Sequence, residues 1–339
     1  MRLITVLITT ILLNNIAIGP AFSQTYQTDD QSTFDSQSAV KNEIPTVIIV
    51  VGASGTVEYE AVFRQSAELW QKAVSKGNAK SVIIGLDEDS NDRALLQDTL
   101  KNEPNEAASA LWLVLIGHGT YDGRTAKFNL RGPDFSSEEL AEWLKPSNRP
   151  VIIINTSSSS APFLNKLSAD NRVVVTATRS GYELNYTRFG QYLAGSITEP
   201  QADLDKDGQT SLLEAFLSAS NRVAEFYSAE GRLATEHALL DDNGDGLGTP
   251  ADWFRGIRPV KKDRDNTTLD GYRAHQFCLI RSETENKMPP QLRAKRDRLE
   301  LEVIKLRDNK ESFSEEQYFT KLEKLLYEMA QIYEQIDEN

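Results

Sequence analysis

Runs of branched apolar residues alternate with segments of helical periodicity from residue 46 onward. The apolar runs predict buried strands, and the segments with apolar residues three and four positions apart predict helices between them. Strands are expected at 46–52, 81–86, 111–117, 151–155 and 172–178, and helices at 59–77, 93–102 and 136–144. Strands that alternate with helices favour an α/β fold, a mainly parallel sheet flanked by helices.

The C-terminal segment predicts two helices joined by a turn. Apolar positions recur at helical spacing within 291–308 and, in a wider stripe, within 318–336. Ser314 and Gln317 form a capping box before the second helix. We expect an antiparallel helical hairpin over 289–339, packed within the chain or against a partner helix.

The N-terminal segment has the pattern of an export signal. Residues 3–18 are mostly apolar, and a small-x-small cleavage site ends at Ser23. The pattern predicts a signal peptide over 1–23 and a disordered polar linker over 24–43, with an uncleaved anchor as the alternative. No later run is apolar enough to cross a bilayer, so we expect an exported protein, periplasmic or extracellular, with no stable membrane span after cleavage.

Charge and cysteine content narrow the class of partner. The 339 residues carry a formal net charge of −13, which repels phosphate backbones and argues against nucleic-acid binding. The same charge suits cations or basic partners. Cys278 is the single cysteine, so an intrachain disulfide is impossible, and its apolar neighbours indicate a buried small side chain.

Two of the expected strands end in residues that could carry chemistry. The run LVLIGHGT places His118 after one strand, and VIIINTSSSS places Ser157 after the next. Function collects at the carboxyl ends of parallel strands, so these side chains could face one cleft as base and nucleophile. A turn histidine and a flexible polar loop are the structural alternatives.

These strand ends resemble the caspase/legumain/gingipain group of cysteine peptidases. In that group one strand ends in His-Gly and a later strand ends in the nucleophile, and Ser157 here stands at the position of the cysteine. The segment VVTATRSGYELNYT also resembles legumain, with Glu183 and Tyr186 three residues apart. The resemblance covers roughly 44–200. It implies a caspase-like sandwich in which Glu183 and Tyr186 contact the substrate.

The resemblance also implies an oxyanion site made by the backbone N–H groups of Gly119 and Ser157. A serine hydroxyl is far less acidic than a thiol and needs a base in direct contact, so the exchange of Cys for Ser favours loss of activity. Three hypotheses follow: a pseudo-peptidase that binds peptide or protein in a cleft, an endopeptidase that uses Ser157 with His118, and a calcium-stabilised structural protein.

The segment DLDKDGQTSLLE has the complete spacing of an EF-hand calcium loop. Aspartates alternate over its first five positions, Gly208 stands at the turn, and an acidic residue closes it at position 12. The expected ligands are Asp203, Asp205, Asp207, the Gln209 carbonyl, Ser211 and Glu214. So many acids in one turn repel each other without a cation, although a solvated acidic turn is the alternative.

A second segment, DDNGDGLGTPAD, repeats this pattern with a shorter last side chain. The expected Ca²⁺ ligands are Asp241, Asn243, Asp245, the Leu247 carbonyl, Thr249 and Asp252. Position 8 is Thr210 in the first loop and Gly248 in the second, so we do not expect a paired lobe that opens on binding. The expected divisions of the chain after 44–200 are a calcium-loop region at 201–260, a connecting segment at 261–288 and the hairpin.

Overall fold

A computed structural model describes residues 44–87, 91–261 and 268–337. These residues belong to one compact unit, Glu43–Asn339. The expected signal peptide and linker lie outside the described residues.

A seven-stranded sheet organises this unit, with the strand order β10-β9-β8-β7-β3-β1-β2. The five strands β2, β1, β3, β7 and β8 are parallel to one another. At one side of the sheet β9 pairs antiparallel with β8, and β10 pairs antiparallel with β9. The strands are β1 (Thr46–Val51), β2 (Lys80–Ile84), β3 (Leu111–Ile116), β7 (Val151–Asn155), β8 (Arg172–Thr176), β9 (Leu239–Asp241) and β10 (Thr249–Pro250). The predicted mainly parallel α/β class is confirmed.

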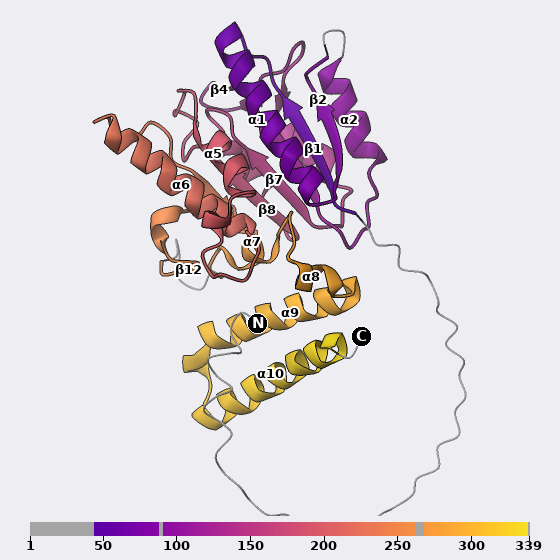
Figure 1. The fold of residues 1–339 in the computed structure, drawn as a ribbon. Helices are drawn as coiled ribbons and strands as arrows, with labels where there is room; N and C mark the ends of the chain where they lie inside the picture. The colour runs from indigo at the N-terminus through magenta and orange to yellow at the C-terminus, as the bar shows by residue number, and fades with distance from the viewer. Residues whose placement is uncertain (1–43, 88–90, 262–267, 338–339) are drawn as a thin grey trace, which may run out of the picture. The chain divides into compact units, whose positions relative to one another are not determined.

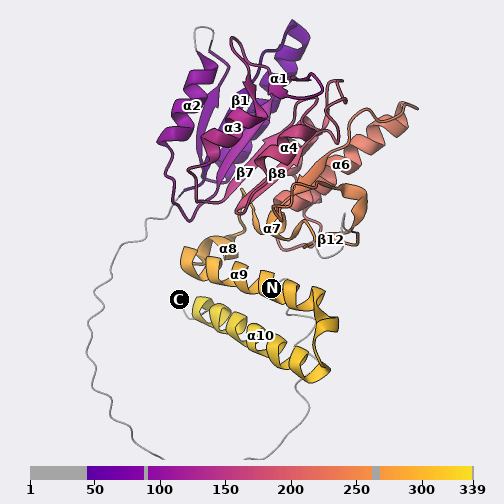
Figure 2. The same cartoon turned by 180° about the vertical axis from the view of Figure 1, so that it is seen from behind.

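Helices cover both faces of the sheet (Figures 1 and 2). One face packs against α1 (Val57–Lys76), α5 (Phe189–Ser196) and α6 (Leu212–Ala229). The other packs against α2 (Asp92–Asn102), α3 (Ser137–Leu144) and α4 (Ala161–Leu167). Val47 and Ile49 point into the first core while Ile48 and Val50 point into the second, which explains why the strands are apolar at every position.

Local capping signals are confirmed where the sequence contains them. Ser136 and Glu139, whose spacing fits the capping-box pattern, form a capping box that starts α3 at Ser137. Thr56 accepts a hydrogen bond from the backbone of Tyr59 and starts α1 two residues earlier than the apolar pattern alone predicts.

A small antiparallel sheet follows β3 and was not predicted. It contains β4 (Gly119–Tyr121), β5 (Ala126–Phe128) and β6 (Phe135–Ser136). Asp122 accepts hydrogen bonds from two backbone N–H groups of the β4–β5 turn, and Gly123 has φ of +90° there. β4 begins one residue after His118, so this small sheet holds the backbone beside the candidate site. A two-stranded ribbon, β11 (Phe254–Arg255) with β12 (Arg258–Pro259), was also not predicted.

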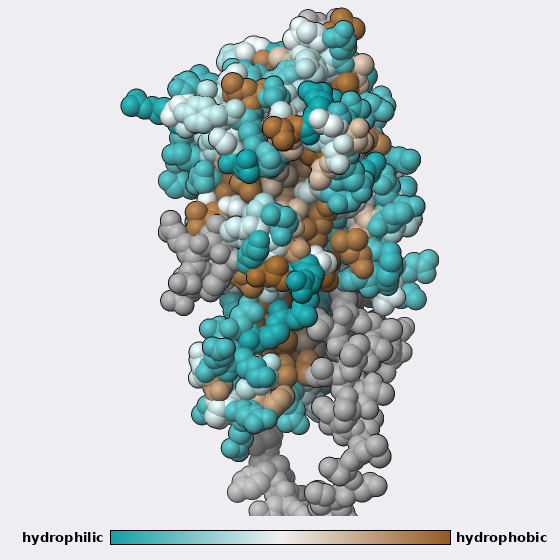
Figure 3. Space-filling view, turned by 90° about the vertical axis from the view of Figure 1, so that its left-hand side faces the viewer, coloured by the Kyte–Doolittle hydropathy of each residue, from teal (hydrophilic) through white to brown (hydrophobic). Residues whose placement is uncertain are grey.

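The C-terminal hairpin consists of α9 (Pro290–Asp308) and α10 (Glu315–Asp337), which pack on each other as predicted. The expected capping box is present, because Ser314 and Gln317 exchange side-chain and backbone hydrogen bonds. Two short helices, α7 (Tyr272–Gln276) and α8 (Glu283–Lys287), precede the hairpin. The face in Figure 3 mixes hydrophilic side chains with small hydrophobic groups. Within the described ranges, no helix combines the length and apolar character that crossing a membrane requires.

Candidate functional site

The ends of β3 and β7 lie side by side, as the sequence predicts. Leu115 pairs with Asn155 in parallel register, and the Thr156 N–H donates to the carbonyl of Leu115 at 3.0 Å. A Cβ atom added to Gly119 would lie 2.8 Å from Ser157 Oγ, so only glycine fits there without movement. The loop after His118 and the loop containing Ser157 are therefore in direct contact.

Ser157 is fully buried and its hydroxyl is already used. Its Oγ donates to Asn155 Oδ1 at 2.7 Å, and its backbone N–H donates to the same oxygen at 3.1 Å. Asn155 is also fully buried, and its Nδ2 has no hydrogen-bond partner. The side chain of Asn155 thus holds both donors of Ser157.

The second expected oxyanion donor is occupied as well. The Gly119 N–H donates to Ser158 Oγ at 3.3 Å, and Ser158 Oγ donates to the Gly119 carbonyl at 3.1 Å. Side chains of the hydroxyl loop, residues 155–160, therefore take both backbone N–H groups that the resemblance assigns to the oxyanion site.

The imidazole of His118 packs away from this hydrogen-bond network. Its ring centroid lies 4.7 Å from that of Tyr59 and 5.1 Å from that of Phe63, and its Nε2 lies 3.3 Å from the carbonyl oxygen of Ser54. Burial lowers the pKa of His118, and the Ser54 carbonyl partly opposes that shift. Among the described residues, no hydrogen bond joins His118 to Ser157, so the imidazole and the hydroxyl are not coupled.

Glu183 contacts the hydroxyl loop through its backbone rather than its carboxylate. Its carbonyl accepts a hydrogen bond from the Ser159 N–H at 2.9 Å. Its carboxylate accepts from His237 Nδ1 at 2.5 Å and from the Arg179 N–H at 3.0 Å. His237 was not singled out from the sequence, because 54 residues separate it from Glu183 and only the fold brings them together.

Tyr186 joins the aromatic cluster around His118. Its ring centroid lies 5.2 Å from that of Tyr59, and burial raises the pKa of Tyr186 to about 12. The segment that contains Glu183 and Tyr186 thus contacts both the hydroxyl loop and the surroundings of His118, and its contact with a substrate stays a prediction.

Two of the remaining hydroxyls of the loop satisfy buried backbone groups. Ser160 Oγ accepts hydrogen bonds from the N–H groups of Ala177 and Thr178, and Thr156 Oγ1 donates to the carbonyl of Leu115. Ser159 adopts φ of +54°, and its Oγ is buried without a partner. A core strand ends in hydroxyls here because its tip is buried and needs polar side chains to replace water.

The first acidic loop brings three carboxylates together. Oxygen atoms of Asp203, Asp205 and Glu214 all lie within 4.8 Å of one another. Gly208 has φ of +87°, which allows the tight turn that the motif requires. Asp207 is outside this group, and its carboxylate accepts from the backbone N–H of Gln209 instead. Three hard oxygen donors on a turn of this shape fit Ca²⁺.

The loop carries features that the motif alone does not contain. Ser211 and Glu214 form the capping box of α6, so Glu214 binds the helix start and the loop at once. His275 lies between two expected ligands, with Nδ1 3.2 Å from Ser211 Oγ and Nε2 3.4 Å from Asp205 Oδ2. His275 comes from α7 and could not be assigned to this loop from spacing.

The second acidic loop is more buried and less convergent. Asp241 is 1% exposed and accepts from the backbone N–H groups of Gly244 and Gly246 at 3.0 Å each. Asp252 is exposed in a 3-10 turn at the other end of the loop. Among the described residues, no three carboxylate, His or Cys ligand atoms of this loop lie within 4.8 Å of one another.

A distant carboxylate, Asp270, completes this second region. It accepts from the N–H groups of Asp242 and Asn243 and from the hydroxyl of Thr249, the last at 2.6 Å. Burial, followed by the adjacent Asp242 carboxylate, raises the pKa of Asp270 to about 9. The pKa of Asp242 is also raised, by burial. Asp270 was missed because nothing in the local sequence links it to residues 241–252.

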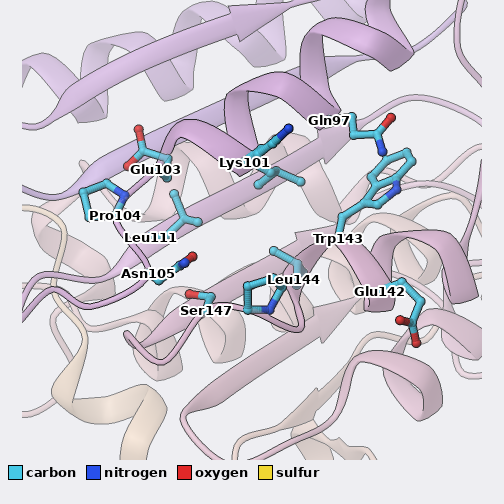
Figure 4. Close-up of a pocket in the computed structure, with 12 residues that line it drawn as sticks. Gln97, Lys101, Glu103, Pro104, Asn105, Leu111, Glu142, Trp143, Leu144 and Ser147 are labelled. Atoms are coloured by element: carbon cyan, nitrogen blue, oxygen red, sulfur yellow. The ribbon is translucent and has the colours of Figure 1, made fainter.

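A cavity of about 240 Å³ lies near the start of β3, at the opposite end of this strand from His118 (Figure 4). Leu111, the first residue of β3, lines it together with Lys101 from α2 and Trp143 from α3. It contains none of the predicted site residues.

Comparisons with known proteins give distant similarities only. No family model matches the chain, and no curated protein sequence matches it. Among solved structures, it is similar to the Drosophila initiator caspase Dronc, with 12% identity over 69% of this chain and 94% of that chain, at a TM-score of 0.40. It is also similar to caspase-1 from Spodoptera frugiperda, with 10% identity over 58% of this chain and 86% of that chain, at a TM-score of 0.40. Likenesses this distant say nothing of activity, and the likeness to legumain and gingipain stays a prediction.

Proposed function

We propose that this chain is an exported pseudo-peptidase of the caspase/legumain type, which binds peptide or protein segments at the strand ends without cleaving them. Calcium stabilises the acidic loops that follow β8 along the chain. The protein acts by binding or scaffolding.

The hydrogen bond from Ser157 Oγ to Asn155 Oδ1, in a fully buried loop, carries this proposal. A serine becomes a nucleophile when a base accepts its proton, and this proton already points to an amide oxygen. A tetrahedral intermediate also needs N–H donors, and the N–H groups of Gly119 and Ser157 are both engaged. A loop with these bonds resists hydrolysis chemistry at two separate steps.

Exposed apolar side chains support a peptide-binding role for the segment around Glu183. Tyr182 is 71% exposed and Leu184 is 62% exposed, on either side of Glu183. The ring of Tyr182 packs edge-on against that of Tyr121 in β4, with centroids 5.3 Å apart. These side chains offer an apolar surface beside the strand ends, where a peptide side chain could be desolvated.

Calcium binding is proposed first for the loop 203–214. Asp203, Asp205 and Glu214 would hold the ion, with the Gln209 carbonyl and Ser211 as further oxygen ligands. Bound calcium neutralises the mutual repulsion of these carboxylates. The second loop, with its buried Asp241, is proposed as the weaker site.

A peptide library incubated with the purified protein, with and without a chelator, tests the proposal. We expect saturable binding and no cleavage, measured by fluorescence anisotropy and mass spectrometry. Tyr182→Ser and Glu183→Ala should weaken binding, while Tyr327→Ser, at an exposed tyrosine of α10, should not. Cleavage that disappears in Ser157→Ala identifies a serine endopeptidase instead. Absence of both binding and cleavage favours a purely structural, calcium-stabilised protein.

A further inference from the structure

The short helix α7 is hydrogen-bonded to the second acidic loop at its start. Asp242 Oδ1 accepts from the N–H of Gly271 at 2.9 Å, and Asp242 Oδ2 accepts from the N–H of Ala274 at 2.7 Å. Asp242 is 1% exposed, so these bonds are protected from water. The start of α7 is therefore fixed to residues next to β9.

The same helix contacts the first acidic loop through the side chain of His275. His275 lies between Ser211 Oγ, at 3.2 Å, and Asp205 Oδ2, at 3.4 Å. Phe277, the residue after α7, also contacts this loop, because its carbonyl accepts a hydrogen bond from the N–H of Leu212 at 2.8 Å. Position and orientation of the loop's ligands therefore depend on where α7 lies.

The third contact of α7 is with the helical hairpin. Gln276 Nε2 donates to the Asp297 carbonyl at 2.8 Å and to Glu300 Oε2 at 3.1 Å, both in α9. Tyr272 Oη accepts from the guanidinium of Arg307 at 3.1 Å. One helix of five residues thus links two acidic loops to α9.

A second link from the first loop reaches α8. The Gln209 side chain accepts from the N–H of Ser282 at 3.1 Å, and Ser282 caps the start of α8. Glu285 of α8 then pairs with Arg293 and Arg296 of α9, and Arg296 is 5% exposed. Two chains of contacts therefore run from the loop 203–214 to the same helix of the hairpin.

We propose that calcium in the loop 203–214 fixes α7 and thereby docks the helical hairpin α9–α10 on the α/β part of the chain. This inference rests on the proposed calcium site. A helix of five residues is not stable alone, so its position follows from its partners. When α7 is in place, His275 holds the side chains of Asp205 and Ser211 in a fixed arrangement. Calcium binds this arrangement more tightly than it binds the loop when α7 is not in place. The coupling is reciprocal: the docked hairpin raises calcium affinity.

Hydrogen–deuterium exchange of the full chain, with calcium chloride or a chelator, tests this coupling. We expect exchange in α9 and α10 to slow by about tenfold at saturating calcium, because the ion stabilises the docked state. Gln276→Ala breaks the contact through α7 and keeps the one through α8, so the calcium-dependent slowing in the hairpin should be smaller than in the wild type. It should also weaken calcium binding several-fold in calorimetry. Gln291→Ala, at an exposed position of the same hairpin, is the matched control and should behave as wild type.

The outcomes separate this inference from the calcium site itself. Calcium that binds in calorimetry without slowing exchange in the hairpin overturns the coupling and leaves the calcium site standing. A hairpin that responds to calcium in Gln276→Ala as strongly as in the wild type overturns the role of α7. No calcium binding to the wild type overturns both the site and the coupling.

Discussion

The hydroxyl loop and the first acidic loop are both polar turns next to buried elements, yet they differ in how their polar atoms are satisfied. In the hydroxyl loop, neutral side chains bind backbone groups and one another, as Ser157 does with Asn155. In the acidic loop, Asp203, Asp205 and Glu214 also accept backbone N–H groups, but their charges still converge within 4.8 Å.

This difference shows that polar side chains next to the end of a strand or helix do not by themselves indicate a catalytic or ligand-binding site. Hydrogen bonds between neutral groups occupy the Ser157 hydroxyl and the N–H groups of Gly119 and Ser157, so these groups are engaged within the loop. Hydrogen bonds to converging carboxylates leave repulsion that a cation removes. The first kind of turn stabilises the fold, and the second kind is the one for which we propose a cation.

The largest contrast is expected in the pH dependence of stability. The raised pKa of Asp270, about 9, means that its stabilising contribution is complete below the unfolded-state pKa near 4 and is lost as pH rises toward 9. In chelator, the free energy of unfolding should fall across this window, with about 1.4 kcal/mol per pH unit for each proton involved. Asp270→Asn should make the slope shallower in denaturant titrations, whereas Asp252→Asn, at an exposed position, should not. Equal slopes in wild type and Asp270→Asn would contradict the buried acid.

Removing one converging charge from the first loop should abolish most of its calcium affinity. Asp205→Asn keeps the shape of the side chain and removes its charge, so we expect affinity to fall by about 100-fold. Isothermal calorimetry measures this directly. Glu323→Gln, at an exposed position of α10, is the control and should bind calcium as wild type does. Equal affinity in Asp205→Asn would place the ion elsewhere.

Introducing a thiol should not by itself make the hydroxyl loop reactive. Ser157→Cys remains buried beside Asn155, so we expect little alkylation by iodoacetamide in peptide mapping. Adding Asn155→Ala removes the acceptor and should speed alkylation by about tenfold. The buried Cys278 is an internal reference in the same sample. Fast alkylation of the single variant would show that the loop is open.

The smallest expected effect compares two capping serines. Ser136→Ala and Ser211→Ala each remove the N-cap of a capping box, and each should cost about 1 kcal/mol in chelator. Calcium should enlarge the loss for Ser211→Ala only, because Ser211 also belongs to the acidic loop. Thermal denaturation in both conditions measures the difference, and an identical response of the two variants to calcium would argue against Ser211 as a ligand.

Periodicity along the chain was enough to predict the parallel core. The run Val151–Asn155 forms a strand with the predicted bounds, and the capping boxes start their helices where they should. The pairing of β3 with β7, which brings the glycine after His118 against Ser157, followed from strand order alone. These features depend on local pattern and on the rule that parallel strands end at one edge.

Features that depend on distant partners could not be predicted. His237 pairs with Glu183, and His275 contacts Asp205, over separations that no sequence motif spans. Asn155 was assigned to a strand, and its side chain could not be known to bind Ser157. The β4–β5 hairpin is different, because Asp122-Gly123 is a turn signal that lay in the sequence.

Labelling with a fluorophosphonate, which reacts with serines that a base has activated, tests the central claim that Ser157 is closed off. Intact-mass measurement of the calcium-saturated wild-type protein should find no adduct. Among the variants, an adduct is expected first in Asn155→Ala, which removes the acceptor of the Ser157 hydroxyl. An adduct on Ser157 of the wild-type chain, absent in His118→Ala, would contradict the claim and identify a working nucleophile.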